Sequence, residues 1–174
     1  METSKQQILD EVRQALAGID ERQQQAFVEA LATAPRVFVT GRGRSGLVAA
    51  AFAARLAQLG TQVYFVGEPT TPAITPGALL VACSGSGRTR GTLLHAEQAR
   101  AAGAEVWTVT QASSSPLATA GSHTVVIPVA SSDQPGASAF EQALLLFLDS
   151  VVLGLMAALG ETPESMLARH ANLE

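Results

Sequence analysis

The sequence predicts an α/β domain in which a five-stranded parallel sheet is flanked by helices on both faces. Five short apolar runs recur along the 174-residue chain, and helical patterns or loops separate them. Each run is almost continuously apolar instead of alternating with polar residues. Such strands are buried on both faces, which is typical of a parallel sheet in a three-layer sandwich.

Two helices are predicted before the sheet, over about residues 4–33. Apolar side chains recur at helical spacing from Ile8 to Ile19. Asp20 and Gln23 then form a capping pair that opens the second of these helices.

The predicted strands span residues 36–40, 62–66, 78–83, 105–110 and 124–129. An alanine-rich helix from about Leu47 to Leu59 follows the first strand, and another helix, which ends near Ala102, follows the third.

A helical tail is predicted from about residue 139 to residue 174. The loop "ASSDQPGAS" (130–138) precedes a long helix from about Ala139 to Leu159. Thr162 followed by Pro163 indicates the N-cap and first residue of a short final helix. Because the chain has the length of one domain and contains no repeat or linker, residues 1–174 are predicted to form a single domain.

Charge and hydropathy exclude several classes of protein. The formal net charge of −4 argues against broad electrostatic binding to nucleic acid or to an acidic membrane. The longest apolar segment, residues 143–159, is interrupted by Asp149 and is short for a membrane span, so we expect a buried core or interface helix. A single cysteine, Cys83, and a polar N-terminus without a signal-peptide core predict a cytoplasmic protein.

Two glycine-rich loops stand where strands give way to helices. "TGRGRSG" (40–46) follows the first strand and "SGSGRT" (84–89) follows the third. Backbone N–H groups at a helix start favour an anion, and glycines let the backbone approach it closely. Hydroxyl donors from the second loop, and nearby positive charge, favour the same ligand: Ser84, Ser86, Thr89, Arg42, Arg44, Arg88 and Arg90. The pattern predicts a phosphate cradle.

Other interpretations of these residues stand beside that one. Gly41, Gly43 and Gly46 satisfy the G-x-G-x-x-G spacing of dinucleotide sites, but Glu68 comes late for the acidic residue such a site needs. The serine loop alone could be a turn with an N-cap. Cys83, His95, His123 and Trp107 are interpreted as packing or surface residues, and three histidines without ligand spacing predict no metal site.

Several long segments resemble the sugar isomerase (SIS) domain family, and within it the 6-phospho-3-hexuloisomerases. They are "GRGRSGLVAAAFAARLAQLG", "VGEPTTPAI", "SGSGRT", "SAFEQALLLFLDSVV" and the ending "MLARHANLE", which is the most specific. The resemblance covers nearly the whole chain and implies a flavodoxin-like or Rossmann-like parallel sheet. Two positions depart from it: relatives commonly have glutamate at Arg88, and the loop before Ser138 is shorter than the resemblance implies.

The resemblance implies interconversion of D-arabino-hex-3-ulose 6-phosphate and D-fructose 6-phosphate, without metal or organic cofactor. It implies Glu141 as the base that moves protons between carbons, and His170 as a ring-opening group, in its own chain or in a neighbouring subunit's site. The expected substrate-binding residues are Gly43, Ser45, Glu68, Ser84, Gly85, Ser86, Gly87, Arg88 and Thr89.

Three functional classes stay open at this point: a hexulose phosphate isomerase, another SIS aldose–ketose isomerase, and a module that binds a sugar phosphate without turnover. The resemblance also implies a homo-oligomer, often a tetramer, with active sites near subunit interfaces. The long helix supports this expectation, because its apolar residues cover more than one face.

Overall fold

The computed structural model describes residues 3–172 and contains a five-stranded parallel sheet in the order β2-β1-β3-β4-β5. The strands are β1 (Val37–Gly41), β2 (Val63–Phe65), β3 (Leu79–Cys83), β4 (Glu105–Thr110) and β5 (His123–Val126). The predicted fold class and all five strands are confirmed. Residues 173–174, the end of the predicted tail, lie outside the described residues.

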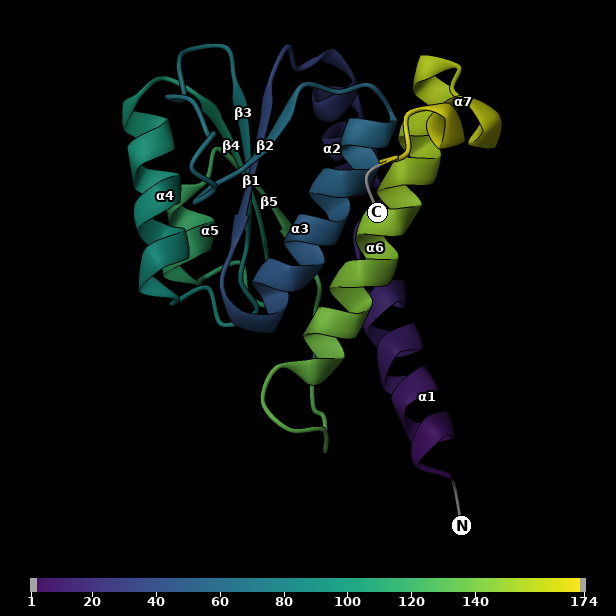
Figure 1. Ribbon diagram of the computed structural model, residues 1–174. Coiled ribbons are helices and arrows are strands. Elements are labelled where there is room, and N and C mark those ends of the chain that lie inside the picture. Colours follow the sequence, from purple (N-terminus) through teal and green to yellow (C-terminus); the bar gives the residue numbers. More distant parts are fainter. Residues whose placement is uncertain (1–2, 173–174) are drawn as a thin grey trace.

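Helices cover both faces of the sheet (Figure 1). On one face lie α4 (Arg90–Ala101) and α5 (Pro116–Ala120). On the other lie α2 (Glu21–Thr33), α3 (Gly43–Gln58) and α6 (Ser138–Leu159), while α1 (Ser4–Ala17) packs against α6 and α7 (Pro163–Ala168) follows it.

Alternate side chains of each strand enter two separate hydrophobic cores. Val37, Val39 and Val81 pack toward α2, α3 and α6, whereas Phe38 and Leu80 pack toward α4. Both sets are almost completely buried. This two-sided burial is the physical reason why the strand sequences are apolar at nearly every position.

Helix α3 begins at Gly43, four residues earlier than the predicted Leu47. Gly43 has φ +59°, which favours glycine, and it lets the chain turn directly from β1 into the helix. Gly41 and Gly46 then touch: a Cβ on Gly46 would lie 2.8 Å from the carbonyl oxygen of Gly41. The glycine motif therefore has two roles. It forms the first turn of α3, and its Gly41–Gly46 contact lets that turn pack directly on the end of β1.

The short helix α5 was not predicted. Ser115 caps it by accepting a hydrogen bond from the Ala118 N–H, and Pro116 is its first residue. This is the same signal that correctly predicted α7, where Thr162 is the N-cap before Pro163. The predicted cap of α2 is also confirmed, since the Asp20 carboxylate accepts from the Arg22 N–H at 2.8 Å.

Helix α6 is long and apolar enough, by length and composition alone, to cross a membrane. Ten of its 22 residues are nevertheless buried inside the domain, and it packs on α1, α2 and α3. Four of its leucines are exposed to solvent: Leu153 is 67% exposed, and Leu145, Leu146 and Leu159 are less so. The prediction that this segment forms a buried core helix is confirmed.

We expect Gly46→Ala to lower the free energy of unfolding by about 1–3 kcal/mol, the usual cost of forcing an extra carbon into a packed contact. The new methyl group would press on the Gly41 backbone, which cannot move without disturbing β1. Urea denaturation measures the change. Ala54→Ser, which adds one atom on the exposed side of the same helix, is the control. Equal stability of Gly46→Ala and the control would contradict this account of the contact.

Candidate functional site

The strand order reverses direction between β1 and β3. From β1 the chain crosses to β2 at the sheet's edge, and from β3 it crosses to β4 on the other side. The two strands end side by side, with Gly41 paired to Cys83. Ligands of open parallel sheets bind at such a switch point, beyond the carboxyl ends of the strands. The two glycine-rich loops meet there.

The loop 84–89, called here the serine loop, is a tight turn stabilised by its own hydroxyl groups. Ser84 is 3% exposed, and its Oγ lies 3.0 Å from Oγ1 of Thr89. The Ser86 hydroxyl accepts a hydrogen bond from the Arg88 N–H at 3.2 Å, and the Gly87 N–H donates to the Ser84 carbonyl at 3.1 Å. The predicted hydroxyl donors are therefore gathered in one turn at the start of α4.

Two glycines of the serine loop are required by their neighbours. Gly87 has φ +59°, and a Cβ there would lie 2.3 Å from the Ser115 hydroxyl. A Cβ on Gly85 would lie 2.9 Å from the Phe140 ring of α6, and the Gly85 carbonyl accepts from Thr110 Oγ1 at 3.1 Å. The loop is thus packed between the starts of α5 and α6, which leave room for glycine at these two positions.

Glu141 lies at the same edge of the sheet. It is 8% exposed in the first turn of α6, next to the Phe140 ring that touches Gly85. Arg44, from the first turn of α3, donates a hydrogen bond from Nε to Oε2 of Glu141 and forms an ion pair with it. Ser45 is buried beside Arg44 in that turn. The fold therefore brings the predicted base, the serine loop and the first glycine-rich loop together.

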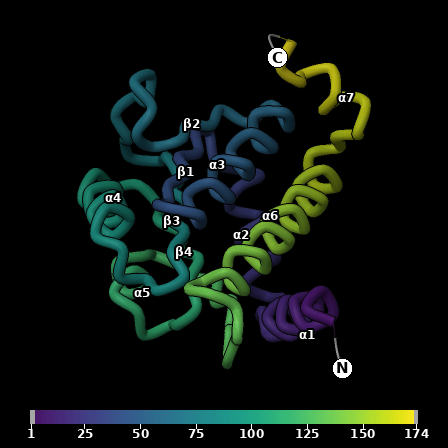
Figure 2. The backbone as a smooth tube through the Cα atoms, turned by 60° about the horizontal axis from the view of Figure 1, so that its bottom comes forward, coloured from purple at the N-terminus to yellow at the C-terminus, as the bar shows by residue number. Residues whose placement is uncertain are grey.

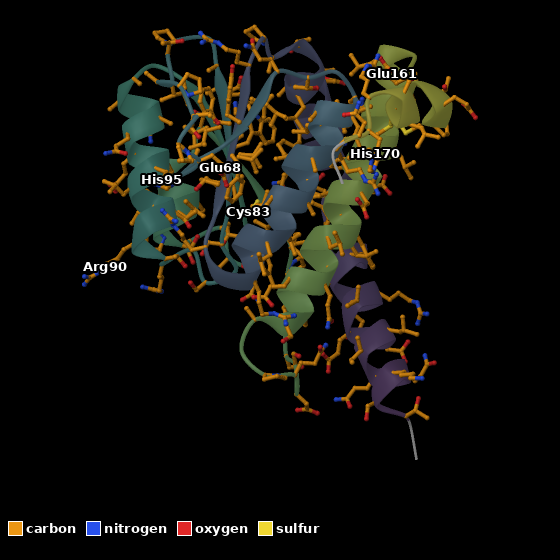
Figure 3. All side chains as sticks on the ribbon, viewed as in Figure 1. Glu68, Cys83, Arg90, His95, Glu161 and His170 are labelled. Carbon is orange, nitrogen blue, oxygen red and sulfur yellow. The ribbon has the colours of Figure 1, made fainter. Side chains whose placement is uncertain are left out.

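The arginines of the two loops differ in their surroundings. Arg42 precedes α3 and lies over Gly91 of α4, where a Cβ would lie 3.1 Å from its Nε. Arg88 and Arg90 are exposed, and Arg90 points away from the protein (Figure 3). Cationic side chains thus lie at the starts of α3 and α4, and their charge favours an anion there.

Glu68 lies in the exposed loop that follows β2. A small cavity of about 100 Å³ on the α4 side of the sheet is lined by His95 of α4 and by Val66, Thr71, Pro72 and Ile74 of this loop. Glu68 itself is not among the residues that line this cavity. Its predicted contact with substrate stays a prediction.

His170 does not lie with Glu141 in the same chain. It is exposed after α7, near the second half of α6, whereas Glu141 is in the first turn of that helix (Figure 3). With Asp149, Leu153 and Arg55 it lines an open groove of about 420 Å³. A role for His170 in catalysis consequently requires a second subunit.

Cys83 and His95, interpreted from the sequence as packing or surface residues, contact other parts of the domain. Burial raises the pKa of the Cys83 thiol to about 12, so it remains protonated and packs in the core. His95 Nδ1 lies 2.8 Å from Oγ1 of Thr40, at the end of β1, and burial together with the nearby Arg42 lowers the pKa of its imidazole. Within residues 3–172, no three His, Cys, Asp or Glu side chains are grouped as metal ligands.

Sequence reasoning missed the link between Arg44 and Glu141. The two residues are 97 positions apart, and each was assigned separately. The sequence signal for this link was that Arg44 lies in the glycine motif at the start of a helix. That position fixes where the Arg44 side chain lies once the fold is known.

Comparison with known proteins identifies the family of the chain. The SIS domain family model matches residues 30–157. The chain is 38% identical to the 3-hexulose-6-phosphate isomerase of Mycobacterium gastri over 96% of this chain and 88% of that protein. It is 34% identical to the enzyme of the same name from Bacillus subtilis, over 97% of this chain and 96% of that protein.

A solved structure is also similar over its full length. A hypothetical protein from Methanococcus jannaschii, whose crystal structure infers a molecular function of 3-hexulose-6-phosphate isomerase, superimposes with a TM-score of 0.88. It is 31% identical and the match covers 95% of this chain and 98% of that one. The chain therefore belongs to the SIS domain family, in the group that contains the 3-hexulose-6-phosphate isomerases.

Proposed function

We propose that this protein is an isomerase that interconverts D-arabino-hex-3-ulose 6-phosphate and D-fructose 6-phosphate, a reaction of formaldehyde fixation in the ribulose monophosphate pathway. One observation carries the proposal: a nearly buried carboxylate, Glu141, is paired with Arg44 of the first glycine-rich loop and follows Phe140, whose ring packs on the serine loop. A phosphate held by such a loop leaves the sugar carbons free to reach the carboxylate.

The phosphate binds in the serine loop. Ser45, Ser84, Ser86 and Thr89 offer hydroxyl groups, and the N–H groups in the first turn of α4, which donate no hydrogen bond to the Thr89 side chain, are further donors. Gly43 has open space where a Cβ would lie, so its backbone can be approached closely, while Gly85 and Gly87 let the loop pack against Phe140 and Ser115. Arg88 is exposed at the rim, where its charge favours the entry of an anion.

Glu141 moves the proton between neighbouring carbons. As general base it removes the proton from C2 of the 3-ketose, and the electron pair forms a 2,3-enediolate with negative charge on O3. A proton then passes from O2 to O3, and the protonated Glu141 returns its proton to C3, which leaves the ketone at C2. Because C2 and C3 are adjacent, one carboxylate on one face of the sugar performs both transfers.

Arg44 orients this base. Its ion pair with Glu141 restricts the carboxylate to one direction, and the guanidinium has further donors for the negative charge that develops on the enediolate oxygens. The chemistry needs no metal or organic cofactor, and we propose a cytoplasmic location for it.

His170 opens the ring of fructose 6-phosphate from a neighbouring subunit. The 3-ketose cannot close a five-membered ring because its C6 oxygen is esterified, but fructose 6-phosphate is mostly cyclic and needs an acid–base group. Two features support assembly into a homo-oligomer, such as a tetramer: the exposed leucines of α6 and the open groove that His170 lines.

Wild-type protein incubated with fructose 6-phosphate in deuterated water should place deuterium on C3 of the sugar, the carbon to which Glu141 returns the proton. Glu141→Gln preserves the shape of the side chain and should reduce this exchange by at least 100-fold, since general-base catalysis contributes about that much. Mass spectrometry of the sugar measures exchange, and calorimetry should show nearly unchanged binding of the sugar phosphate.

Glu97→Gln, on the exposed face of α4, is the control for this experiment. If Glu141→Gln exchanges at a near-normal rate, the base is elsewhere and Glu68 becomes the next candidate. Binding by the wild type without any exchange would replace the proposal with a module that only binds a sugar phosphate.

Replacing Ser84 and Ser86 together by alanine should raise KM about tenfold or more, because each hydrogen bond to a charged group contributes roughly 1.5–3 kcal/mol. Steady-state kinetics measure the constant. The double variant Thr33→Ala/Thr61→Ala removes two hydroxyls that precede β1 and β2, at the opposite edge of the sheet, and should leave KM unchanged. A folded Ser84/Ser86 variant with a normal KM would exclude the serine loop as the phosphate site.

Subunits that carry Glu141→Gln and subunits that carry His170→Asn should complement one another when co-expressed. In a mixed assembly, an intact Glu141 can meet an intact histidine from its neighbour, so part of the activity returns. Mixing either single variant with the double variant is the control and restores nothing. Lack of complementation between inactive single variants, or a monomer in sedimentation at micromolar concentration, would refute the shared site.

A further inference from the structure

The N-terminal helix α1 reaches the loop in front of α6 through one carboxylate. Oε2 of Glu11 accepts hydrogen bonds from the Ser132 hydroxyl at 2.6 Å and from Nε2 of Gln134 at 2.8 Å. Its other oxygen accepts from Nε2 of Gln7 at 3.3 Å, and the same amide group donates to Asp133 Oδ2 at 3.2 Å. Three consecutive residues of the loop are therefore held from α1, which lies beside this segment in Figure 2.

The hydrogen-bond chain continues from the loop into α6. The Gln134 side-chain oxygen accepts from Nε2 of Gln142 at 2.9 Å, and Gln142 is the residue after Glu141. The N–H of Glu141 itself donates to the carbonyl of Ala137, at the end of the loop, at 3.0 Å. Two bonds thus tie the loop to the turn that carries the proposed base.

The loop has little else to fix its position. Residues 130–136 are polar or small and are exposed or only partly buried, so the loop has no large apolar anchor in the core. Hydrogen bonds to a carboxylate are stronger than those between neutral groups. The bonds from Ser132 and Gln134 also keep the pKa of Glu11 below its usual value, so this acceptor is charged at neutral pH.

We propose that Glu11 is a positioning residue for the isomerase reaction: through Ser132, Gln134 and Gln142 it holds the loop and the first turn of α6 where Glu141 meets Arg44. The inference rests on the proposed function. Glu11 contacts neither the serine loop nor Arg44, so its loss displaces the base and leaves the phosphate site intact.

The test uses Glu11→Ala and Gln134→Ala, singly and together, in the full chain. We expect each single variant to lower kcat about tenfold, since a misplacement of about 1 Å can cost up to 100-fold, and to keep KM within about twofold of wild type. The double variant should be no slower than the slower single variant, because both changes break one hydrogen-bond chain.

Hydrogen–deuterium exchange of the backbone amides gives a readout that does not depend on activity. Amides of residues 130–142 should exchange roughly tenfold faster in Glu11→Ala, while those of the sheet remain protected. Glu29→Ala, which removes an exposed carboxylate from α2, is the matched control. Gln134 is on a surface loop, so its variant remains informative if Glu11→Ala folds poorly.

Unchanged amide exchange in folded Glu11→Ala and Gln134→Ala would overturn the inference, as would faster exchange with an unchanged kcat. A rise in KM with a normal kcat would also overturn it, because the phosphate site would then be the part affected. An inactive wild type would refute the proposed isomerase instead, and the amide exchange would still test the link between Glu11 and α6.

Discussion

The backbone contact between Gly41 and Gly46 determines how close α3 lies to the end of β1, and the site is built outward from there. Because neither residue has a Cβ, the first turn of α3 packs directly on the last residue of the strand. Arg44 and Ser45 are in that turn, so the contact fixes their height above the sheet. Arg44 then meets Glu141, which arrives from a helix almost one hundred residues later.

The same edge of the sheet carries the positive charge that an acidic protein needs to bind an anion. The chain has a net charge of −4, yet arginines at positions 42, 44, 88 and 90 surround the starts of α3 and α4. Unpaired N–H groups at those helix starts add to the positive potential. Positive charge is therefore concentrated at this edge, where we propose that the phosphate binds, and Glu141 enters this region paired with one of the arginines.

Helix α6 has three tasks along its length. Its first turn presents Glu141, and its buried face fills the core between α1, α2 and α3. Its exposed leucines and the groove beside His170 lie on the remaining surface. If subunits associate through that surface, as we propose, one rigid helix connects the packing of the domain, the base and the contact with the neighbouring subunit.

The sequence alone determined the layer architecture, the five strands and the two glycine-rich loops at which we propose that the phosphate binds. These depend on local properties: continuous apolar runs for strands buried on both faces, glycines where the backbone must turn or approach, and Ser or Thr before Pro at a helix start. The α5 signal at Ser115 and Pro116 was equally local and was overlooked. The start of α3 was misplaced by four residues because glycine is a poor helix former, and only its contact with β1 explains a helix there.

The tertiary structure decided which distant side chains meet. It paired Arg44 with Glu141, placed Phe140 against Gly85, and linked Glu11 to Ser132 and Gln134 across more than 120 residues of sequence. It also separated His170 from Glu141, although the resemblance named them together. Such contacts depend on strand order and on how helices pack across the sheet, and neither is encoded in the residues next to those that meet.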